Sequence, residues 1–334
     1  MEPVKIAIVG LGRIASLLED DALREKPCTH AGAVTARTDC LLTAGADRDE
    51  HRRRLFAGRW GVPVYADAAR MLQEHQPAVL CVATPPDSHL RYCALAAEYG
   101  VSVVVCEKPL ADSLQSARKI AALQKNGNVR VITNHERRYA ADYIEAREIL
   151  RKEELGALLS VKAALYMGRT RRIRDVLWHD GTHLIDALMF LTGGRPRHNG
   201  RFGAQLSSRE GTAFLSGYLR PEKTGGPKPP PVPIPFLIEA GAGRDHLVFG
   251  MEFSCERGRL RIGNGVFEVW ESGPSPYAEK FRSLKKMREG FEGPTGYFAN
   301  MLADAAACAG DPACRPCSGA EDGLRVIEYL HRLN

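Results

Sequence analysis

The sequence predicts a two-domain α/β protein, with a doubly wound parallel sheet first and then an α+β domain whose open sheet is mostly antiparallel. Up to about residue 134, apolar runs of strand length alternate with stretches of helical periodicity. Later segments alternate with a period of two residues. The 334 residues also exceed what one hydrophobic core usually holds. We expect domains at residues 1–134 and 135–334, and the C-terminal helix can pack back on the first.

Strands of the first domain are expected where apolar runs are continuous, which is typical of parallel strands covered on both faces. Five runs qualify: Val4–Val9, Leu41–Ala46, Val79–Ala83, Val101–Cys106 and Val129–Thr133. The helices expected between them are Asp49–Arg59, Ala66–Glu74, Ser88–Tyr99 and Ser113–Lys125. Helix-like sequence also follows the first strand from Arg13.

The second domain is expected to begin with a helix at Tyr139–Lys152. Six segments of period two follow: Leu159–Tyr166, Ala213–Tyr218, Phe236–Ala240, Leu247–Phe253, Arg259–Ile262 and Val266–Trp270. Proline lacks the N–H that a sheet ladder needs, so the proline-rich stretch 221–235 is expected to be an extended loop between two strands. Helices at Tyr297–Ala309 and Ala320–Leu333 close the chain.

The composition is that of an ordinary globular protein, with 44% hydrophobic and 26% charged residues. A formal charge of +6 suits anionic small molecules and is too small to argue for nucleic acid. With no signal peptide and no membrane-length apolar run, we expect a cytoplasmic protein that does not bind membranes. The nine cysteines are expected to be reduced, and Cys314 and Cys317 lack the second ligand pair of a zinc site, so no metal is predicted.

A dinucleotide site is predicted at residues 10–15, GLGRIA, directly after the first strand. Gly10 permits the tight turn, and Gly12 lets the backbone approach a pyrophosphate. Arg13 and Ile14 open the helix, whose free N–H groups would receive the negative charge, and Ala15 keeps that helix close to the strand.

Asp47 ends the second strand and is the candidate for the ribose hydroxyls, which favours NAD. Arg48 and the arginines at 52–54 follow at once, so NADP is the alternative, with one of them on the 2′-phosphate. The spacing from Gly12 exceeds the usual ~20 residues. We assign the excess to Glu19–Thr38, either as an insertion or as an extended first helix.

Together these residues resemble the Gfo/Idh/MocA oxidoreductases. The motifs occur in the family's order: GLGRIA at 10–15, AGADRD at 44–49, ATPPDSH at 83–89, CEKPL at 106–110 and GTHLIDAL at 181–188. The resemblance implies a Rossmann domain followed by an open antiparallel sheet domain. It also implies NAD(P)-dependent oxidation or reduction of a secondary hydroxyl of a sugar, cyclitol or related polyol. In relatives the open sheet face is buried, so we expect a homodimer or homotetramer formed through the C-terminal sheet.

The resemblance also implies roles for individual residues. Thr84, Pro85 and His89 would line the nicotinamide side of the cofactor. Glu107 would contact the cofactor, and Lys108, before a bond that is often cis in relatives, would be the catalytic lysine. A desolvated lysine beside the positive nicotinamide can take the hydroxyl proton, and His183 would hydrogen-bond the same oxygen.

The chain departs from the family four residues before His183, where relatives commonly have aspartate. Here His179 occupies that place, and Asp180 precedes Gly181. On a regular helix His179 shares a face with His183, whereas Asp180 turns about 100° away. We expect His179 to orient His183, and the alternative is a distorted helix start that brings Asp180 in.

Arginines at 169, 171, 172 and 174 stand where relatives have a glycine-rich loop. They are either a solvated basic edge or a clamp for an anionic substrate, with Arg169 and Arg172 as its candidates. Arg138 resembles a family position that faces the same cleft.

Two other functions stay open. One is an NADP-linked reductase of a non-sugar substrate, and the other is a catalytically silent regulator that senses the dinucleotide. Retention of Lys108 and His183 argues against the silent regulator.

Overall fold

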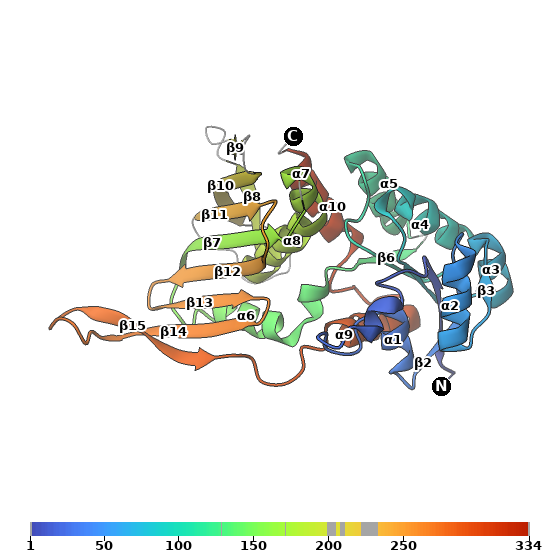
Figure 1. Ribbon diagram of the computed structural model, residues 1–334, viewed down its shortest axis with the longest axis horizontal. Helices are drawn as coiled ribbons and strands as arrows, with labels where there is room; N and C mark the ends of the chain where they lie inside the picture. The colour runs from blue at the N-terminus through green and yellow to red at the C-terminus, as the bar shows by residue number, and fades with distance from the viewer. Residues whose placement is uncertain are drawn as a thin grey trace. The chain divides into compact units, whose positions relative to one another are not determined.

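A six-stranded parallel sheet organises the N-terminal part of the computed structural model, which is drawn from blue to blue-green in Figure 1. Its strand order is β3-β2-β1-β4-β5-β6. Its strands are β1 Val4–Val9, β2 Cys40–Ala46, β3 Val64–Tyr65, β4 Val79–Val82, β5 Val103–Cys106 and β6 Arg130–Thr133. Neighbouring strands are parallel throughout. The strand order reverses between β1 and β4, which is where open sheets of this type bind their ligands. The predicted doubly wound sheet is confirmed.

In the part of the chain that the structure describes, four crossover helices connect these strands, and all but α4 begin at a capping side chain that accepts from an N–H of the first turn. They are α2 Glu50–Trp60, α3 Ala68–His75, α4 His89–Glu98 and α5 Leu114–Lys125. Asp49 accepts from the Arg52 N–H, and Ser113 accepts from the Ser116 N–H. These caps lie within one residue of the predicted helix starts.

The first crossover helix is interrupted by an insertion. After Gly12 the chain makes one helical turn and a 3₁₀ helix, η1 Leu17–Asp20, and then leaves the helix axis. It returns at α1 His30–Thr35. The His30 N–H donates to Ile14 O (3.1 Å) and the Ala31 N–H to Ala15 O (3.0 Å), so the helix ladder closes across the excursion. Of the two alternatives for the excess spacing, the insertion is correct.

Two carboxylates of the insertion, Glu19 and Glu25, accept hydrogen bonds that hold the inserted segment in place. Glu19 accepts from the Cys28 N–H (3.2 Å) and from Thr29 Oγ1 (2.6 Å), and Thr29 in turn caps α1. A Cβ on Gly32 would lie 2.4 Å from Glu19 Oε2, so this contact leaves no room for a side chain. Glu25 accepts from the Gly296 N–H (2.6 Å) at the start of α9 Tyr297–Gly310. Glu19 therefore links the start of the insertion to its end, and Glu25 ties the insertion to the segment that begins α9.

A second sheet follows, in the order β15-β14-β13-β12-β7-β11-β10-β8, with β9 paired to β10. Its strands are β7 Leu158–Met167, β8 Gly194–His198, β9 Gln205–Ser207, β10 Thr212–Pro221, β11 Ile234–Gly241, β12 Leu247–Cys255, β13 Gly258–Gly263, β14 Val266–Pro274 and β15 Arg282–Glu289. Only β7 and β11 pair in parallel among the strands described. The expected open, mostly antiparallel sheet is confirmed.

The two faces of this sheet differ in character. Phe249, Met251 and Phe253 of β12 are buried and alternate with half-exposed residues. Helices α6 Ala141–Arg151 and α8 Gly181–Thr192 lie along the sheet in Figure 1. On the other face, strand register places one row side by side across five strands: Leu237, Lys162, Glu252, Arg261 and Glu268.

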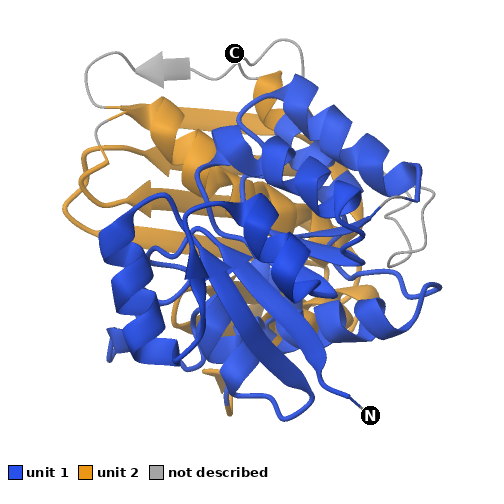
Figure 2. Ribbon diagram, turned by 90° about the vertical axis from the view of Figure 1, so that its right-hand side faces the viewer, with its two compact units in different colours: residues 1–140, 294–328 blue, residues 141–293, 329–334 orange. Residues whose placement is uncertain are grey.

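The chain forms two compact units, coloured separately in Figure 2. The first holds residues 1–140 with 294–328, and the second holds 141–293 with 329–334. Residues 135–334 thus divide between the units, because α9 and most of α10 Ala320–His331 join the first.

The structure describes residues 2–127, 129–170, 172–198, 205–207, 211–221 and 233–332. Residues 222–232 of the expected proline-rich loop lie outside these ranges. β10 and β11, which flank them, pair with each other. Among the described residues, every helix is too short or too polar to cross a membrane.

Candidate active site

The glycine turn after β1 has the geometry that a pyrophosphate site needs. Gly10 has φ +85°, a backbone conformation that side chains disfavour, and a Cβ there would lie 2.6 Å from Ala83 O. Backbone strain and steric overlap each exclude a side chain at this position. At Gly12 a Cβ would approach only Arg52 Nη1, at 3.8 Å, so space is open beside the turn. Arg13 is exposed and Ile14 is half-buried. The turn can therefore accept a diphosphate on its backbone N–H groups.

Asp47 is tied to that turn. Its Oδ2 accepts from the Leu11 N–H (2.8 Å), and its Oδ1 accepts from the Asp49 N–H (2.9 Å). Arg52 Nη1 lies 3.7 Å from Asp47 Oδ2, whereas Arg48 is exposed and Arg53 donates to the carbonyl oxygens of residues 47 and 48. The carboxylate thus lies beside the glycine turn, where a ribose would follow the pyrophosphate.

The loops after β4, β5 and β6 leave the sheet at the same edge. The Ala83 N–H donates to Val9 O, the Glu107 N–H to Val82 O and the Asn134 N–H to Cys106 O. Each bond extends the parallel ladder by one residue beyond the strands. Thr84, Asn134 and the turn at Glu107–Lys108–Pro109, which we call the EKP turn, are therefore gathered at the carboxyl edge, next to the glycine turn.

Glu107 takes part in a buried charged pair. Its Oε1 lies 2.8 Å from His30 Nε2 and accepts from Asn134 Nδ2 at 2.6 Å. Burial by itself would lower the pKa of His30, but contacts with Cys81 and Glu107 raise it to about 10. Burial would likewise raise the pKa of Glu107, but His30, Asn134 and Lys108 lower it. Both partners are therefore charged at neutral pH.

His89 has a different role from the one that the resemblance implied. Its side chain is fully buried, so it presents no surface to a cofactor. His89 Nε2 lies 2.8 Å from Thr84 O, and Nδ1 lies 3.1 Å from Pro109 O and 3.2 Å from Leu110 O. The ring thus ties the loop after β4 to the EKP turn. The contacts of its ring nitrogens are with these two loops, and its buried ring leaves no exposed surface for lining the nicotinamide side.

Lys108 follows directly on the buried Glu107. The Lys108–Pro109 bond is cis, as the resemblance implies, and Lys108 is half-buried. Pro85 is exposed and Thr84 is half-buried. Buried neighbours on either side of Lys108 fix its backbone, and its side chain retains access to solvent.

In the second unit, the helix that carries His183 begins with a π turn. Residues Val176–Asp180 are π-helical, and the Gly181 N–H donates to Val176 O. α8 then continues through His183, which is half-buried. His179 is exposed, whereas Asp180 is half-buried. The helix start is distorted, which is the condition under which we expected Asp180 to replace His179.

The candidate arginines differ in exposure. Arg169 and Arg172 are exposed, on the short connection between β7 and the helix of His183, and Arg171 lies outside the described residues. Arg138 is buried, and it contacts Asp322 at 3.2 Å and the Cys317 carbonyl at 3.1 Å. Arg138 therefore joins β6 to the start of α10, and this makes it a weak substrate candidate.

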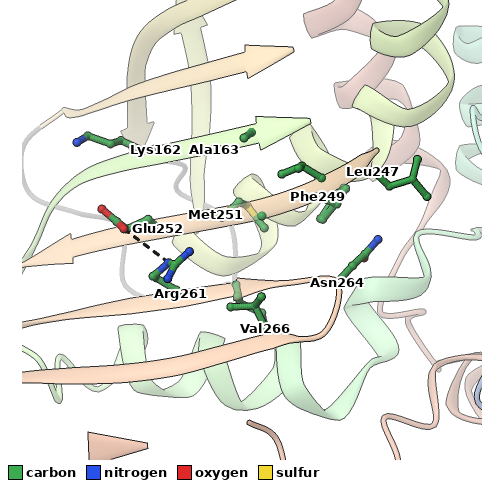
Figure 3. Close-up of a pocket in the computed structure, with 13 residues that line it drawn as sticks. Lys162, Ala163, Leu247, Phe249, Met251, Glu252, Arg261, Asn264 and Val266 are labelled. Carbon is green, nitrogen blue, oxygen red and sulfur yellow. Dashed lines mark ion pairs between the residues drawn. The ribbon is translucent and has the colours of Figure 1, made fainter. Parts of the chain in front are cut away.

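A hollow of about 550 Å³ opens on the second sheet (Figure 3). Lys162, Glu252 and Arg261 line it, and Figure 3 shows Glu252 and Arg261 paired across neighbouring strands. No residue predicted for the cofactor or the catalysis is among those that line it. The hollow is a feature of the open face of the second sheet.

Residues 4–135 match the model of the Gfo/Idh/MocA family, described as an oxidoreductase family with an NAD-binding Rossmann fold. This match confirms the resemblance: residues 4–135 are similar to the NAD-binding Rossmann domain of these oxidoreductases.

Two curated relatives are similar to this chain in sequence, and one solved structure is similar to it in fold. An inositol 2-dehydrogenase of Arthrobacter sp. is 29% identical, over 58% of this chain and 55% of its own length. A D-glucoside 3-dehydrogenase of Escherichia coli is 26% identical, over 57% and 54%. The chain thus spans about half the length of these curated relatives. An aldose-aldose oxidoreductase from Caulobacter crescentus shares the fold with a TM-score of 0.76, at 18% identity over 99% of this chain and 96% of that one.

Sequence reasoning missed His30 and Asn134. His30 lies within the segment assigned to an insertion, and Asn134 directly follows a strand. Neither belongs to a motif that the sequence analysis used. A histidine as the first residue of a helix of small residues was the available signal for a buried partner of Glu107.

The glycine turn leads to a paired prediction. Gly12→Ala should keep the free energy of unfolding within about 1 kcal/mol of wild type, because its Cβ has space, and should weaken NAD binding at least ~10-fold. Gly10→Ala should lose about 2 kcal/mol or more from strain and overlap. Urea unfolding and NAD titration by fluorescence measure both. Unchanged NAD affinity in Gly12→Ala would show that the pyrophosphate binds elsewhere.

The buried pair predicts a pH-dependent stability. His30→Leu should cost about 3–5 kcal/mol, because it leaves the Glu107 charge buried and unpaired. The raised pKa of His30 makes its contribution complete below about pH 6.5 and lost as the pH rises towards 10. The lowered pKa of Glu107 makes its contribution complete above about pH 4.3 and lost in stronger acid. The deficit in urea unfolding should therefore be larger at pH 5.5 than at pH 9.

The exposed His246 provides the control for that experiment. His246→Leu should change stability by less than about 0.5 kcal/mol at either pH. An equal deficit for His30→Leu at both pH values would contradict a charged pair.

Proposed function

We propose that the protein transfers hydride between NAD and a secondary hydroxyl or keto group of a sugar, cyclitol or sugar derivative. The observation that carries this proposal is the convergence of the glycine turn, Asp47 and the EKP turn at one edge of the parallel sheet. The named activities of the two curated relatives support the substrate class. NADP is the alternative cofactor, because Arg52 lies near Asp47 and could meet a 2′-phosphate.

NAD supplies the hydride acceptor when bound, and this chain supplies binding and proton transfer. The backbone N–H groups of the glycine turn hold the pyrophosphate, and Asp47 accepts from the ribose hydroxyls. Lys108 Nζ takes the proton of the substrate hydroxyl, or returns it in the reverse direction. Glu107 contributes by fixing the backbone before Lys108, since its carboxylate is already held by His30 and Asn134.

His183 is proposed to hydrogen-bond the same substrate oxygen and orient it. We propose Asp180 as its partner in place of His179, on two observations. The π turn changes the angular relation that favoured His179, and Asp180 is the more buried of the two. π turns of this kind occur often at functional sites.

Substitution of the lysine tests the catalytic proposal. Lys108→Met should lower kcat by about 10²–10⁴-fold, because it removes the proton acceptor, and should leave NAD affinity nearly unchanged. Turnover of sugars and cyclitols is followed by NADH absorbance, with NAD and NADP in parallel. Lys119→Met, an exposed lysine on α5, is the matched control and should retain full activity. A thermal shift with NAD but no turnover of any substrate would favour the sensing regulator.

We propose that Arg169 and Arg172 recognise an anionic group of the substrate. Both are exposed and close in the chain to the helix of His183, within the same unit. Guanidinium groups bind carboxylates and phosphates through charge-assisted hydrogen bonds.

If these arginines recognise an anionic group, Arg172→Ala should raise KM about tenfold or more for sugar acids or sugar phosphates. This corresponds to the loss of one hydrogen bond to a charged group, at ~1.5–3 kcal/mol. KM for neutral sugars should stay unchanged. Arg118→Ala, an exposed arginine on α5, serves as the control. An equal change for neutral and acidic substrates would contradict charge recognition.

We also propose that the open face of the second sheet joins copies of this chain into a homodimer or homotetramer. Phe214, Tyr218 and Leu237 are 46%, 41% and 43% exposed, and the register of β10 and β11 places them on that face. An apolar group of this kind is typical of an association surface.

Leu237→Glu should shift the molecular mass measured by light scattering towards the monomer, because it buries a charge in the interface. Leu55→Glu on α2, at a leucine of similar exposure (45%), should leave the mass unchanged. A wild-type protein that is monomeric at high concentration would refute the interface.

A further inference from the structure

Two thiols lie in direct contact at the end of α9, and neither belongs to the residues gathered at the carboxyl edge of the parallel sheet. Cys308 Sγ and Cys314 Sγ are 2.7 Å apart. Cys308 is fully buried in the last turns of the helix, and Cys314 is half-buried in the loop that follows. Asp304 lies one turn before Cys308, and Cys308 Sγ donates to Asp304 Oδ1 at 3.9 Å. None of these residues takes part in the proposed hydride transfer.

Such a group could in principle serve a thiophilic metal, since the three ligand atoms lie within 4.8 Å of one another. Two features argue against it. Thiolates at ~2.3 Å from a tetrahedral zinc ion lie about 3.8 Å apart, well beyond the observed 2.7 Å. Asp304 Oδ2 already accepts from Tyr139 OH (2.8 Å) and from the Cys317 N–H (2.9 Å). The sulfur spacing is closer to that of a covalent pair, at ~2.05 Å.

We propose that Cys308 and Cys314 form an oxidisable dithiol, which a small-molecule disulfide such as oxidised glutathione converts into an intrachain disulfide. This inference does not depend on the hydride transfer proposed above. The modification site is assigned from the contact between the two sulfurs and from the loop that holds them together.

The loop geometry maintains the contact. The Cys314 N–H donates to Asp311 O (3.1 Å), and Arg130 Nη1 donates to the same carbonyl (2.8 Å). Further along, the Cys317 N–H is held by Asp304. Both flanks of Cys314 are therefore attached to the first unit. Bond formation needs an approach of less than about 1 Å between the sulfurs.

The order of events follows from exposure. Cys314 can be reached from solvent, so its thiolate attacks the oxidant, releasing one reduced thiol and leaving a mixed disulfide on Cys314. Cys308 then attacks Cys314 Sγ and displaces the second half of the oxidant as a thiolate, which takes up the Cys308 proton by way of Asp304 and leaves as the second thiol. Two S–H bonds are lost, one S–S bond forms, and the oxidant gains the two electrons. Burial raises the pKa of Cys308 to about 12, which keeps it protonated until this second step.

Peptide mapping of the full chain tests the proposal. The protein is incubated with oxidised glutathione, its remaining thiols are alkylated, and its peptides are analysed by mass spectrometry. The expected product is a peptide that links Cys308 to Cys314, two hydrogens lighter than the dithiol form. Thiol titration should fall by two per chain, and dithiothreitol should restore both.

Matched variants identify the pair. Cys308→Ser and Cys314→Ser should each prevent the cross-link, and if one of them misfolds the other still gives the result. Cys317→Ser should form the cross-link as wild type does, since Cys317 is not part of the proposed pair. A cross-link between Cys314 and Cys317 would overturn the proposal. So would continued alkylation of both Cys308 and Cys314, or one equivalent of zinc that protects them until it is chelated.

Discussion

The ion pair between His30 and Glu107 is the constraint on which the organisation of the first unit depends. A carboxylate taken out of water costs several kcal/mol unless a partner compensates it, and here His30 and Asn134 both do so. The three side chains come from α1, the end of β5 and the end of β6. One buried charge therefore holds three separate pieces of backbone in register. The residue that gains from this arrangement is Lys108, whose backbone follows the pair directly.

The same constraint explains why the insertion is tolerated. His30 is the first residue of α1, and its N–H completes the helix that begins after Gly12. His30 thus connects the glycine turn and the EKP turn. Its backbone N–H bonds to the helix that follows the glycine turn, and its side chain contacts Glu107. His89 makes a similar connection between the loop after β4 and the EKP turn. The loops at this strand edge are thus held together by two buried imidazole rings. His30 contacts a carboxylate oxygen, and His89 contacts carbonyl oxygens.

Much of this fold could be predicted from the sequence, because its strongest signals are local. Continuous apolar runs gave the strands of the parallel sheet, and the period-two pattern of Phe249, Met251 and Phe253 gave a strand with one buried face. β15 escaped prediction because charged residues dominate it. The candidate site could be proposed from the sequence where motifs carry it, as at Gly10 and Lys108. The parts of the candidate site at His30 and at the π turn before His183 could not be predicted. Both depend on tertiary contacts that form only after folding, and the spacing of residues in the sequence does not indicate them.

The closure of the helix across residues 16–29 has an evolutionary consequence. The two break points of the helix are joined by consecutive backbone hydrogen bonds, so the excursion starts and ends at neighbouring positions. The entropy of closing a loop grows only slowly with its length. Segments of different size can therefore be exchanged at this junction without displacing the parallel sheet or its glycine turn, which makes the junction a natural acceptor for new recognition elements.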